Sequence, residues 1–242
     1  MSDNAPSLPN GVCLRVPKAG HTADEYEDAA SLACGNWPAH GAVADGATES
    51  AFARTWAEQI ATGATEMGVT AAEALRAELP AWQTAWRAAV DARTEALPWY
   101  AAAKAADGAF ATVLTCTLHR AGTWQALSVG DCVLFHVRDG TLQTAWPVTD
   151  ADAFTNRPTL LPSQPAASVP DVETTNGTWR PGDVLVLATD AAAAWLLRTD
   201  PARALSLTPD TFANAVADAR AAGTLRNDDT TLLRLHCAPA TS

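Results

Sequence analysis

The sequence predicts an α+β fold in which helices and β-strands form separate layers. Apolar runs typical of strands come first, two helical segments follow, and a block of strands then precedes further helices and a last strand. Strands grouped apart from helices favour a layered sandwich with mostly antiparallel sheets, because successive parallel strands need a crossover between them. No repeat or linker-like stretch divides the 242 residues, so a single domain over residues 1–242 is expected.

The first strands are predicted from three short apolar runs, at residues 12–16, 31–34 and 42–44. The hydrophobic period then changes, and a helix is expected from Thr48 to about Ala61. Thr48 is a suitable N-cap residue, and Glu49 would place a negative charge at the positive end of the helix dipole.

A second and longer helix is predicted after residue 70. Thr70 and Glu73 form a capping-box pattern. An apolar stripe then recurs every three or four residues, at Leu75, Leu79, Trp82, Trp86 and Val90. Pro80 is expected to kink this helix or to divide it in two, because proline removes a backbone hydrogen bond inside a helix.

From residue 110 the apolar residues alternate with a period of two. This pattern predicts successive antiparallel strands at 110–118, 123–129, 132–137 and 142–148. Asp139-Gly140 is a hairpin signal between the last two of them. The next segment, about 149–177, is rich in Pro, Thr, Asn and Asp, and we expect a long loop of the kind that is often functional.

The C-terminal part is predicted to contain two strands with helices between them. The fully apolar run 184–188 is a buried strand, and 230–235 is the last strand. The clearest helix begins with Thr208 as its cap and Pro209 at its first position, and ends at Gly223.

Composition excludes several classes of protein. Sixteen Lys and Arg against 27 Asp and Glu give a formal charge of −11, which argues against a broad nucleic-acid interface. Neither a signal peptide nor a membrane-spanning run is visible, and no membrane partner is expected. The five cysteines show no disulfide or zinc spacing, so we expect reduced thiols and a cytoplasmic location.

Acidic residues lie at the ends of several apolar strands. A single loop aspartate is ordinarily a cap or turn former, and Asp139 and Asp183 fit that description. Four other sites border strongly apolar strands, where carboxylates from distant parts of the chain can converge: Glu27-Asp28, Asp45-Gly46, Thr189-Asp190 and Asn227-Asp228-Asp229.

Converged carboxylates repel one another unless cations neutralise them. Oxygen ligands without a His or Cys cluster suit hard divalent ions such as Mg²⁺ or Mn²⁺. A pair of such ions can activate a water and clamp a phosphoryl group, which would reconcile an acidic protein with an anionic substrate.

Five short stretches resemble, in the same order, the motifs of the PP2C-type (PPM) metal-dependent serine/threonine phosphatases. The stretches are Tyr26–Ala29, Val43–Gly46, Ser128–Asp131, Leu187–Asp190 and Asn227–Thr231. The resemblance covers about residues 12–236. It implies a four-layer α/β/β/α sandwich, a binuclear Mn²⁺ or Mg²⁺ centre, and hydrolysis of phosphoserine or phosphothreonine by a metal-activated water.

The resemblance also implies a role for each motif residue. Asp45 would bridge two ions, Gly46 would offer its carbonyl to one, and Asp190 and Asp228 would complete the other. Glu27 and Asp28 would hold the second ion directly or through water. Asp131 stands where the family has a carboxylate able to bind a third ion, or it is simply a turn residue. Asp45, Asp190 and Asp228 are therefore the expected catalytic residues.

The residues that would grip the substrate depart from the family pattern. Ala23 replaces an arginine that binds phosphate in many members. Lys18 and Arg157 are the leading replacements, because Arg157 lies in the loop that corresponds to the family's mobile flap and a planar guanidinium suits a phosphate. Arg15 and His21 are further candidates, and all four can equally be solvated surface residues.

Other positions depart without removing a predicted ligand. Ala47-Thr48-Glu49 follows Gly46 where the family has glycine-rich residues, and where eukaryotic members carry a histidine that protonates the leaving group. A metal-bound water or His40 would then have to donate that proton. Ala191 replaces a glycine, and Asp229 replaces an asparagine common in eukaryotic members.

The sequence therefore predicts a cytoplasmic, metal-dependent phosphatase whose partner is a phosphorylated protein, the target of a Ser/Thr kinase. Two alternatives stay open. One is a pseudophosphatase-like module that binds a partner without turnover, and the other is an enzyme acting on small phosphate esters. A serine hydrolase is disfavoured, since no G-x-S-x-G motif is present.

Overall fold

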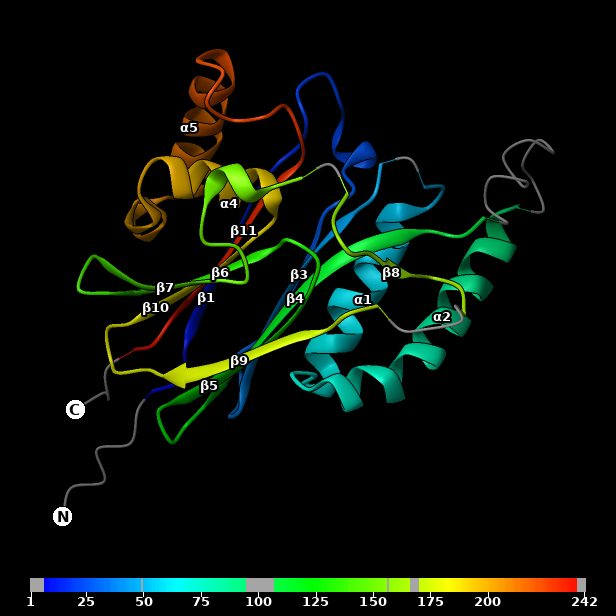
Figure 1. The fold of residues 1–242 in the computed structure, drawn as a ribbon, viewed down its shortest axis with the longest axis horizontal. Helices are drawn as coiled ribbons and strands as arrows, with labels where there is room; N and C mark the ends of the chain where they lie inside the picture. The colour runs from blue at the N-terminus through cyan, green and yellow to red at the C-terminus, as the bar shows by residue number, and fades with distance from the viewer. Residues whose placement is uncertain (1–6, 49, 95–106, 156, 166–169, 239–242) are drawn as a thin grey trace.

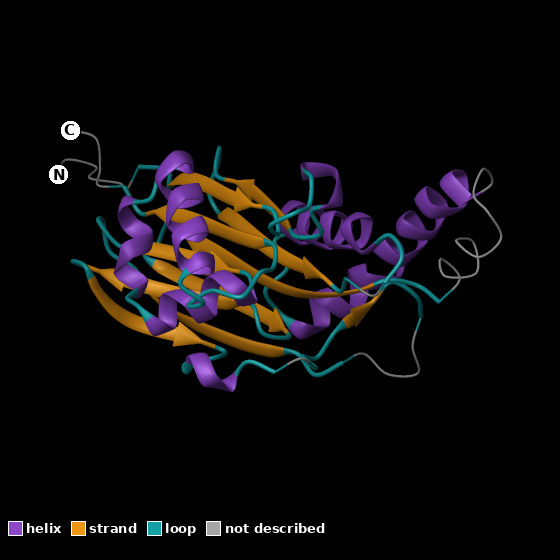
Figure 2. Ribbon diagram, turned by 90° about the horizontal axis from the view of Figure 1, so that it is seen from above, coloured by secondary structure: helices purple, strands orange, loops and turns teal. Residues whose placement is uncertain are grey.

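Two antiparallel β-sheets pack face to face, and helices cover both outer faces (Figures 1 and 2). The computed structural model describes residues 7–48, 50–94, 107–155, 157–165 and 170–238. The predicted four-layer α/β/β/α sandwich is confirmed. No helix in these ranges is long and apolar enough to cross a membrane.

The first sheet, called sheet I here, has five strands in the order β1-β11-β10-β6-β7. All of its strand pairs are antiparallel. The strands are β1 (Asn10–Val16), β6 (Val133–Arg138), β7 (Thr141–Trp146), β10 (Val184–Ala188) and β11 (Thr230–His236).

The second sheet, sheet II, has the strand order β2-β3-β4-β5-β9, with the short β8 paired to β4. Its pairs are also antiparallel. The strands are β2 (Ala29–Ala33), β3 (Ala39–Gly46), β4 (Phe110–His119), β5 (Thr123–Val129), β8 (Leu161–Pro162) and β9 (Glu173–Thr178).

Helices α1 (Ala53–Met67) and α2 (Ala72–Thr94) cover sheet II, whereas α4 (Asp190–Arg198) and α5 (Pro209–Ala221) cover sheet I (Figure 1). The described part of the chain also contains three short 3₁₀ helices: η1 (Ala23–Glu25), η2 (Ala151–Ala153) and η3 (Pro201–Ser206).

Three apolar cores hold the layers together, because both faces of each sheet are buried. Alternation along β3 illustrates this: Ala42 and Ala44 face the α1 and α2 layer, whereas Val43 faces sheet I. The predicted stripe on α2 packs against α1 and belongs to the same apolar core as the outer face of sheet II. On the other side, Trp195 of α4 and Phe212 of α5 pack on sheet I.

Two expectations about the helices differ from the structure. Helix α1 begins at Ala53, not at Thr48, because the residue before it, Phe52, has a left-handed backbone conformation (φ of 60°) that a right-handed helix does not contain. Glu49 lies outside the described residues. Pro80 does not divide α2, which runs through it as one helix.

The expected long loop, 149–177, contains regular structure. It includes η2, β8 and the first part of β9, which pairs with β5 at the edge of sheet II. The sequence of β9, ETTNGT, is polar and partly exposed, so it lacks the apolar alternation that marks the inner strands. The backbone hydrogen bonds to β5 hold it there instead of a buried face.

Because the strands are antiparallel, many of them begin or end at the same edge of the sandwich, the edge that runs across the strand ends. In sheet II, β3 ends there and β2 and β4 begin there. In sheet I, β1 and β10 end beside the start of β11. The four acidic sites expected from the sequence therefore lie at the same edge.

Candidate metal centre

Three carboxylates from separate parts of the chain line one cavity of about 460 Å³ at this edge. Asp45 is the seventh residue of β3, Asp190 follows β10, and Asp228 lies in the turn before β11. The other charged side chains that line it are Lys18 and Arg226. Thr155, Pro158 and Leu160, from the segment between β7 and β8, form an outer wall.

Asp28 does not line this cavity; it is buried near Asp45 and only 3% exposed. One of its carboxylate oxygens, Oδ2, accepts hydrogen bonds from the hydroxyls of Thr189 (2.8 Å) and Thr231 (2.7 Å). Burial raises the pKa of Asp28 to about 8, and the nearby Asp229 and Asp190 add to the effect. These two hydroxyls come from sheet I, so Asp28 also links the two sheets.

Other carboxylates around the cavity are also crowded by negative charge. Burial and the neighbouring carboxylates, Asp28 first, hold the pKa of Asp45 well above its usual range, although part of its side chain faces the cavity. Burial, with Asp190 nearby, raises the pKa of Asp131 to about 7. Such shifts are the mark of carboxylates gathered in excess of positive charge.

The loops that carry Lys18 and Glu27 are fixed by the turn before β11. The carboxylate of Asp229 accepts hydrogen bonds from the backbone amides of Lys18 (2.8 Å) and Glu27 (2.6 Å). From α5, Arg220 donates to the carbonyls of Pro17 (2.9 Å) and Asp228 (2.6 Å). The presence of Asp229 in place of an asparagine thus has a structural explanation, because a carboxylate can accept hydrogen bonds from both amides.

Arg226 is the residue of this site that the sequence analysis missed. Its guanidinium forms ion pairs with Asp190 and with Asp228, the latter at 2.8 Å. Partial burial opposes its charge, but the two carboxylates outweigh burial and raise the pKa of Arg226. The signal was present as a basic residue two positions before Asp228, directly before the Asn227–Thr231 motif, which was interpreted only for its acids.

The chemistry of the donors fits a hard divalent cation. One oxygen of the buried Asp131, Oδ1, has no hydrogen-bond partner within the described part of the chain, so it is available to bind a cation. Across residues 7–48, 50–94, 107–155, 157–165 and 170–238, no three Asp, Glu, His or Cys side chains are already set as a closed cluster. The carboxylates share a cavity, and Arg226 neutralises two of them.

The remaining predicted residues are distributed as follows. Gly46 lines the cavity, and a Cβ at this position would lie 2.8 Å from the Glu27 carbonyl, so the two residues are in close backbone contact. Glu27 is partly buried beside Asp228 and Asp229, and burial, the main cause, raises its pKa. Lys18 lines the cavity.

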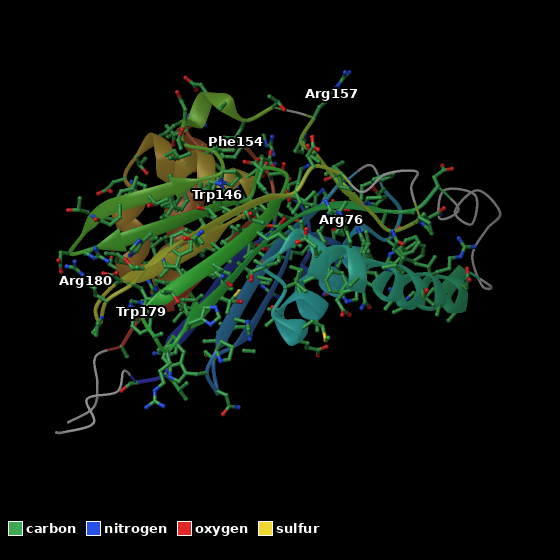
Figure 3. All side chains as sticks on the ribbon, turned by 60° about the horizontal axis from the view of Figure 1, so that its bottom comes forward. Arg76, Trp146, Phe154, Arg157, Trp179 and Arg180 are labelled. Carbon is green, nitrogen blue, oxygen red and sulfur yellow. The ribbon has the colours of Figure 1, made fainter. Side chains whose placement is uncertain are left out.

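Three other candidates lie away from the cavity. Arg157 is exposed and its side chain points outward from the body of the protein (Figure 3). Arg15 donates to the carbonyl of Ala30 at 2.8 Å. His40 is five residues before Asp45 along an extended strand, a separation of about 16 Å, and bonds to Thr117 at 2.8 Å. That separation rules out His40 as the proton donor.

The raised pKa of Asp28 predicts how stability depends on pH. The folded protein retains a proton on Asp28 up to about pH 8, whereas the unfolded chain loses it near pH 4. Since the folded state binds more protons in that window, the metal-free protein should lose stability as pH rises from 6 to 8, and Asp28 alone should contribute up to about 1.4 kcal/mol per pH unit.

Urea denaturation in EDTA at pH 6, 7 and 8 measures this slope. Asp28→Asn keeps an oxygen that can accept from Thr189 and Thr231 but cannot ionise, so its slope should be smaller. A wild-type stability that rises between pH 6 and 8 would contradict the prediction.

Comparison with known proteins gives one family and many structural relatives. The family described as Protein phosphatase 2C matches residues 23–227. No protein of curated function matches the sequence.

Solved structures similar to this chain include bacterial phosphatases. The Mycobacterium tuberculosis serine/threonine phosphatase PstP is 18% identical, with a TM-score of 0.60 over 96% of this chain and 100% of the other. PppA, described as a regulatory component of the type VI secretion system (T6SS) in Pseudomonas aeruginosa, is also 18% identical, with a TM-score of 0.61 over 96% and 99%. The catalytic domain of PstP has also been solved with two manganese ions; it is 18% identical, with a TM-score of 0.59 over 96% and 99%.

Proposed function

The chain belongs to the protein phosphatase 2C family, and from this premise we propose that it is a metal-dependent phosphatase acting on phosphoserine and phosphothreonine in proteins. The observation that carries the proposal is the convergence of Asp45, Asp190 and Asp228 on one cavity. Three carboxylates and two cationic side chains give this cavity an excess of negative charge. The site therefore binds a divalent cation more readily than it binds a phosphate ion on its own.

In this proposal the ligands are those implied by the motifs. Asp45 and the Gly46 carbonyl would hold the ions from sheet II, and Asp190 and Asp228 from sheet I. Glu27 and Asp28 would hold one ion directly or through water, and Asp131 would serve a third. The structure of PstP with two manganese ions supports Mn²⁺ or Mg²⁺ as the cofactor. Bound ions would supply positive charge for the phosphoryl group and lower the pKa of a water.

The chain's own groups would orient the substrate. Lys18 is a cationic side chain on the cavity wall and is held in place through its backbone by Asp229. Pro158 and Leu160 give one side of the cavity an apolar lining that limits the access of water. The substrate would be a phosphoprotein in the cytoplasm, the product of a Ser/Thr kinase.

The test is hydrolysis of a phosphothreonine peptide and of p-nitrophenyl phosphate by the purified protein. We expect activity with Mn²⁺, its loss in EDTA, and its return when Mn²⁺ is added in excess. Elemental analysis of the protein should show bound divalent metal. A metal-loaded protein that cleaves neither compound would contradict the proposal.

The alternative is a pseudophosphatase-like module that binds a partner without turnover. Two observations favour it: Ala23 stands where many members bind phosphate, and Arg226 pairs with two of the proposed ligands. This alternative predicts phosphopeptide binding with no hydrolysis under any metal, which the same assay distinguishes from the enzyme.

A further inference from the structure

Arg226 occupies an unusual position for a cation in a candidate metal centre. Its guanidinium joins Asp190, which is buried, to Asp228, and its own side chain is half exposed. Asp190 begins α4 and lies 36 residues before Arg226, whereas Asp228 lies in the turn before β11, so a single cation holds two chain segments together. Without a cation these carboxylates would repel each other.

Arg226 also lies between two hollows. It lines the 460 Å³ cavity with Asp45 and Lys18, and it lines an adjoining cavity of about 280 Å³ that includes Asp152, Phe154 and Arg198. Asp190 is the other residue shared by both. A half-exposed guanidinium on a shared wall has space to leave the carboxylates and still face the larger cavity.

We propose that Arg226 alternates between two partners: it is the internal counter-cation of Asp190 and Asp228 in the metal-free protein, and it binds the substrate phosphate once divalent ions take those carboxylates. The proposal rests on the proposed function. A guanidinium and a divalent ion compete for the same carboxylate oxygens, so metal binding must displace Arg226. The planar guanidinium then suits a phosphate by two parallel hydrogen bonds.

This assignment also accounts for the departures in the substrate-gripping residues. Ala23 carries no charge, and the exposed Arg157 points away from the cavity. Among the described residues that line the larger cavity, the cationic side chains are Lys18 and Arg226. The phosphate-binding arginine would thus come from the turn before β11 and not from the segment after β1.

The first experiment measures metal affinity and stability, neither of which needs turnover. Arg226→Gln keeps the length and some hydrogen-bonding capacity but removes the charge. Calorimetric titration of EDTA-treated protein with Mn²⁺ should show about fivefold tighter binding than wild type, because no internal cation has to be displaced. In EDTA the same variant should melt a few degrees lower, and Mn²⁺ should remove that difference. Equal or weaker Mn²⁺ binding would overturn the proposal.

Arg198→Gln is the matched control. Arg198 lines the adjoining cavity and pairs with the exposed Asp152 at 3.4 Å, but the structure gives it no bond to the proposed metal ligands. Its Mn²⁺ affinity should equal that of wild type. An Arg226 with a purely structural role would lower the melting temperature equally with and without Mn²⁺.

The second experiment tests the phosphate partner. Inorganic phosphate should bind Mn²⁺-loaded Arg226→Gln about tenfold more weakly than loaded wild type, as measured by calorimetry. In turnover, KM for the phosphopeptide should rise by a similar factor while kcat changes little. Unchanged phosphate affinity would overturn this half of the proposal. If wild type binds no Mn²⁺, the proposed function fails instead, and melting in EDTA still decides whether Arg226 is the internal cation.

Discussion

Replacing Asp45 by Asn should reduce phosphatase turnover by at least about 100-fold, which corresponds to about 2.7 kcal/mol of transition-state stabilisation. Asp45 is the proposed ligand of both metal ions, and an amide is a weaker ligand for a hard cation than a carboxylate. The measurement is kcat on a phosphothreonine peptide at saturating Mn²⁺. Asp190→Asn and Asp228→Asn should show losses of about the same order.

Although Asp45→Asn should lower turnover, it should not lower the stability of the metal-free protein. Burial and nearby carboxylates raise the pKa of Asp45, so removing its charge relieves repulsion. In EDTA at pH 8 the melting temperature of Asp45→Asn should equal or exceed that of wild type. Asp139→Asn, in an exposed hairpin turn with φ of 49°, is the matched control and should change neither quantity. An Asp45→Asn protein that is folded and fully active would remove Asp45 from the proposed centre.

Replacing Trp56 by Ala should cost about 3–5 kcal/mol of the free energy of unfolding. Trp56 of α1 is fully buried against sheet II and makes an edge contact with Trp86 of α2, with ring centroids 6.5 Å apart. Its indole N–H also donates to the carbonyl of Leu161 at 2.8 Å. The substitution leaves a large cavity and removes this hydrogen bond, and chemical denaturation measures the loss of stability.

Two further variants separate the contributions. Trp56→Phe keeps an aromatic ring but loses the hydrogen bond to Leu161, so its cost should be clearly smaller than that of Trp56→Ala. Phe110→Ala changes a ring that is 38% exposed, and it should cost about 1 kcal/mol or less. A Trp56→Ala protein as stable as Phe110→Ala would contradict the packing of α1 described above.

Much of the fold was predictable because the inner strands and long helices have strong periodicities. Strand β4 is a nearly continuous buried run because both of its faces are covered, and the stripe on α2 is the one buried face of that helix. The carboxylates were predictable for a different reason. The carboxylates lie at strand ends. In an antiparallel sheet the end of one strand lies beside the start of its neighbour, so topology alone places these carboxylates at one edge of the sandwich.

The missed features depend on side-chain directions or on backbone pairing. Nothing in the sequence shows that Arg226 turns toward Asp190 and Asp228, or that Arg157 points outward. Strand β9 is polar and was expected to be loop, because an edge strand needs only one neighbour and no apolar face. Helix α1 begins later than expected because the backbone of Phe52 is left-handed, which the sequence does not reveal.

The hydrogen bonds of Asp28 have a mechanical consequence for the whole sandwich. Apolar side chains between two sheets resist separation but do little to prevent one sheet from sliding across the other. Asp28 precedes β2 of sheet II and accepts from Thr189 and Thr231 of sheet I, so it pins the sliding register at the edge that carries the cavity. Shear between the sheets would misalign Asp45 with Asp190 and Asp228, and the two hydrogen bonds of Asp28 oppose that shear beside these carboxylates.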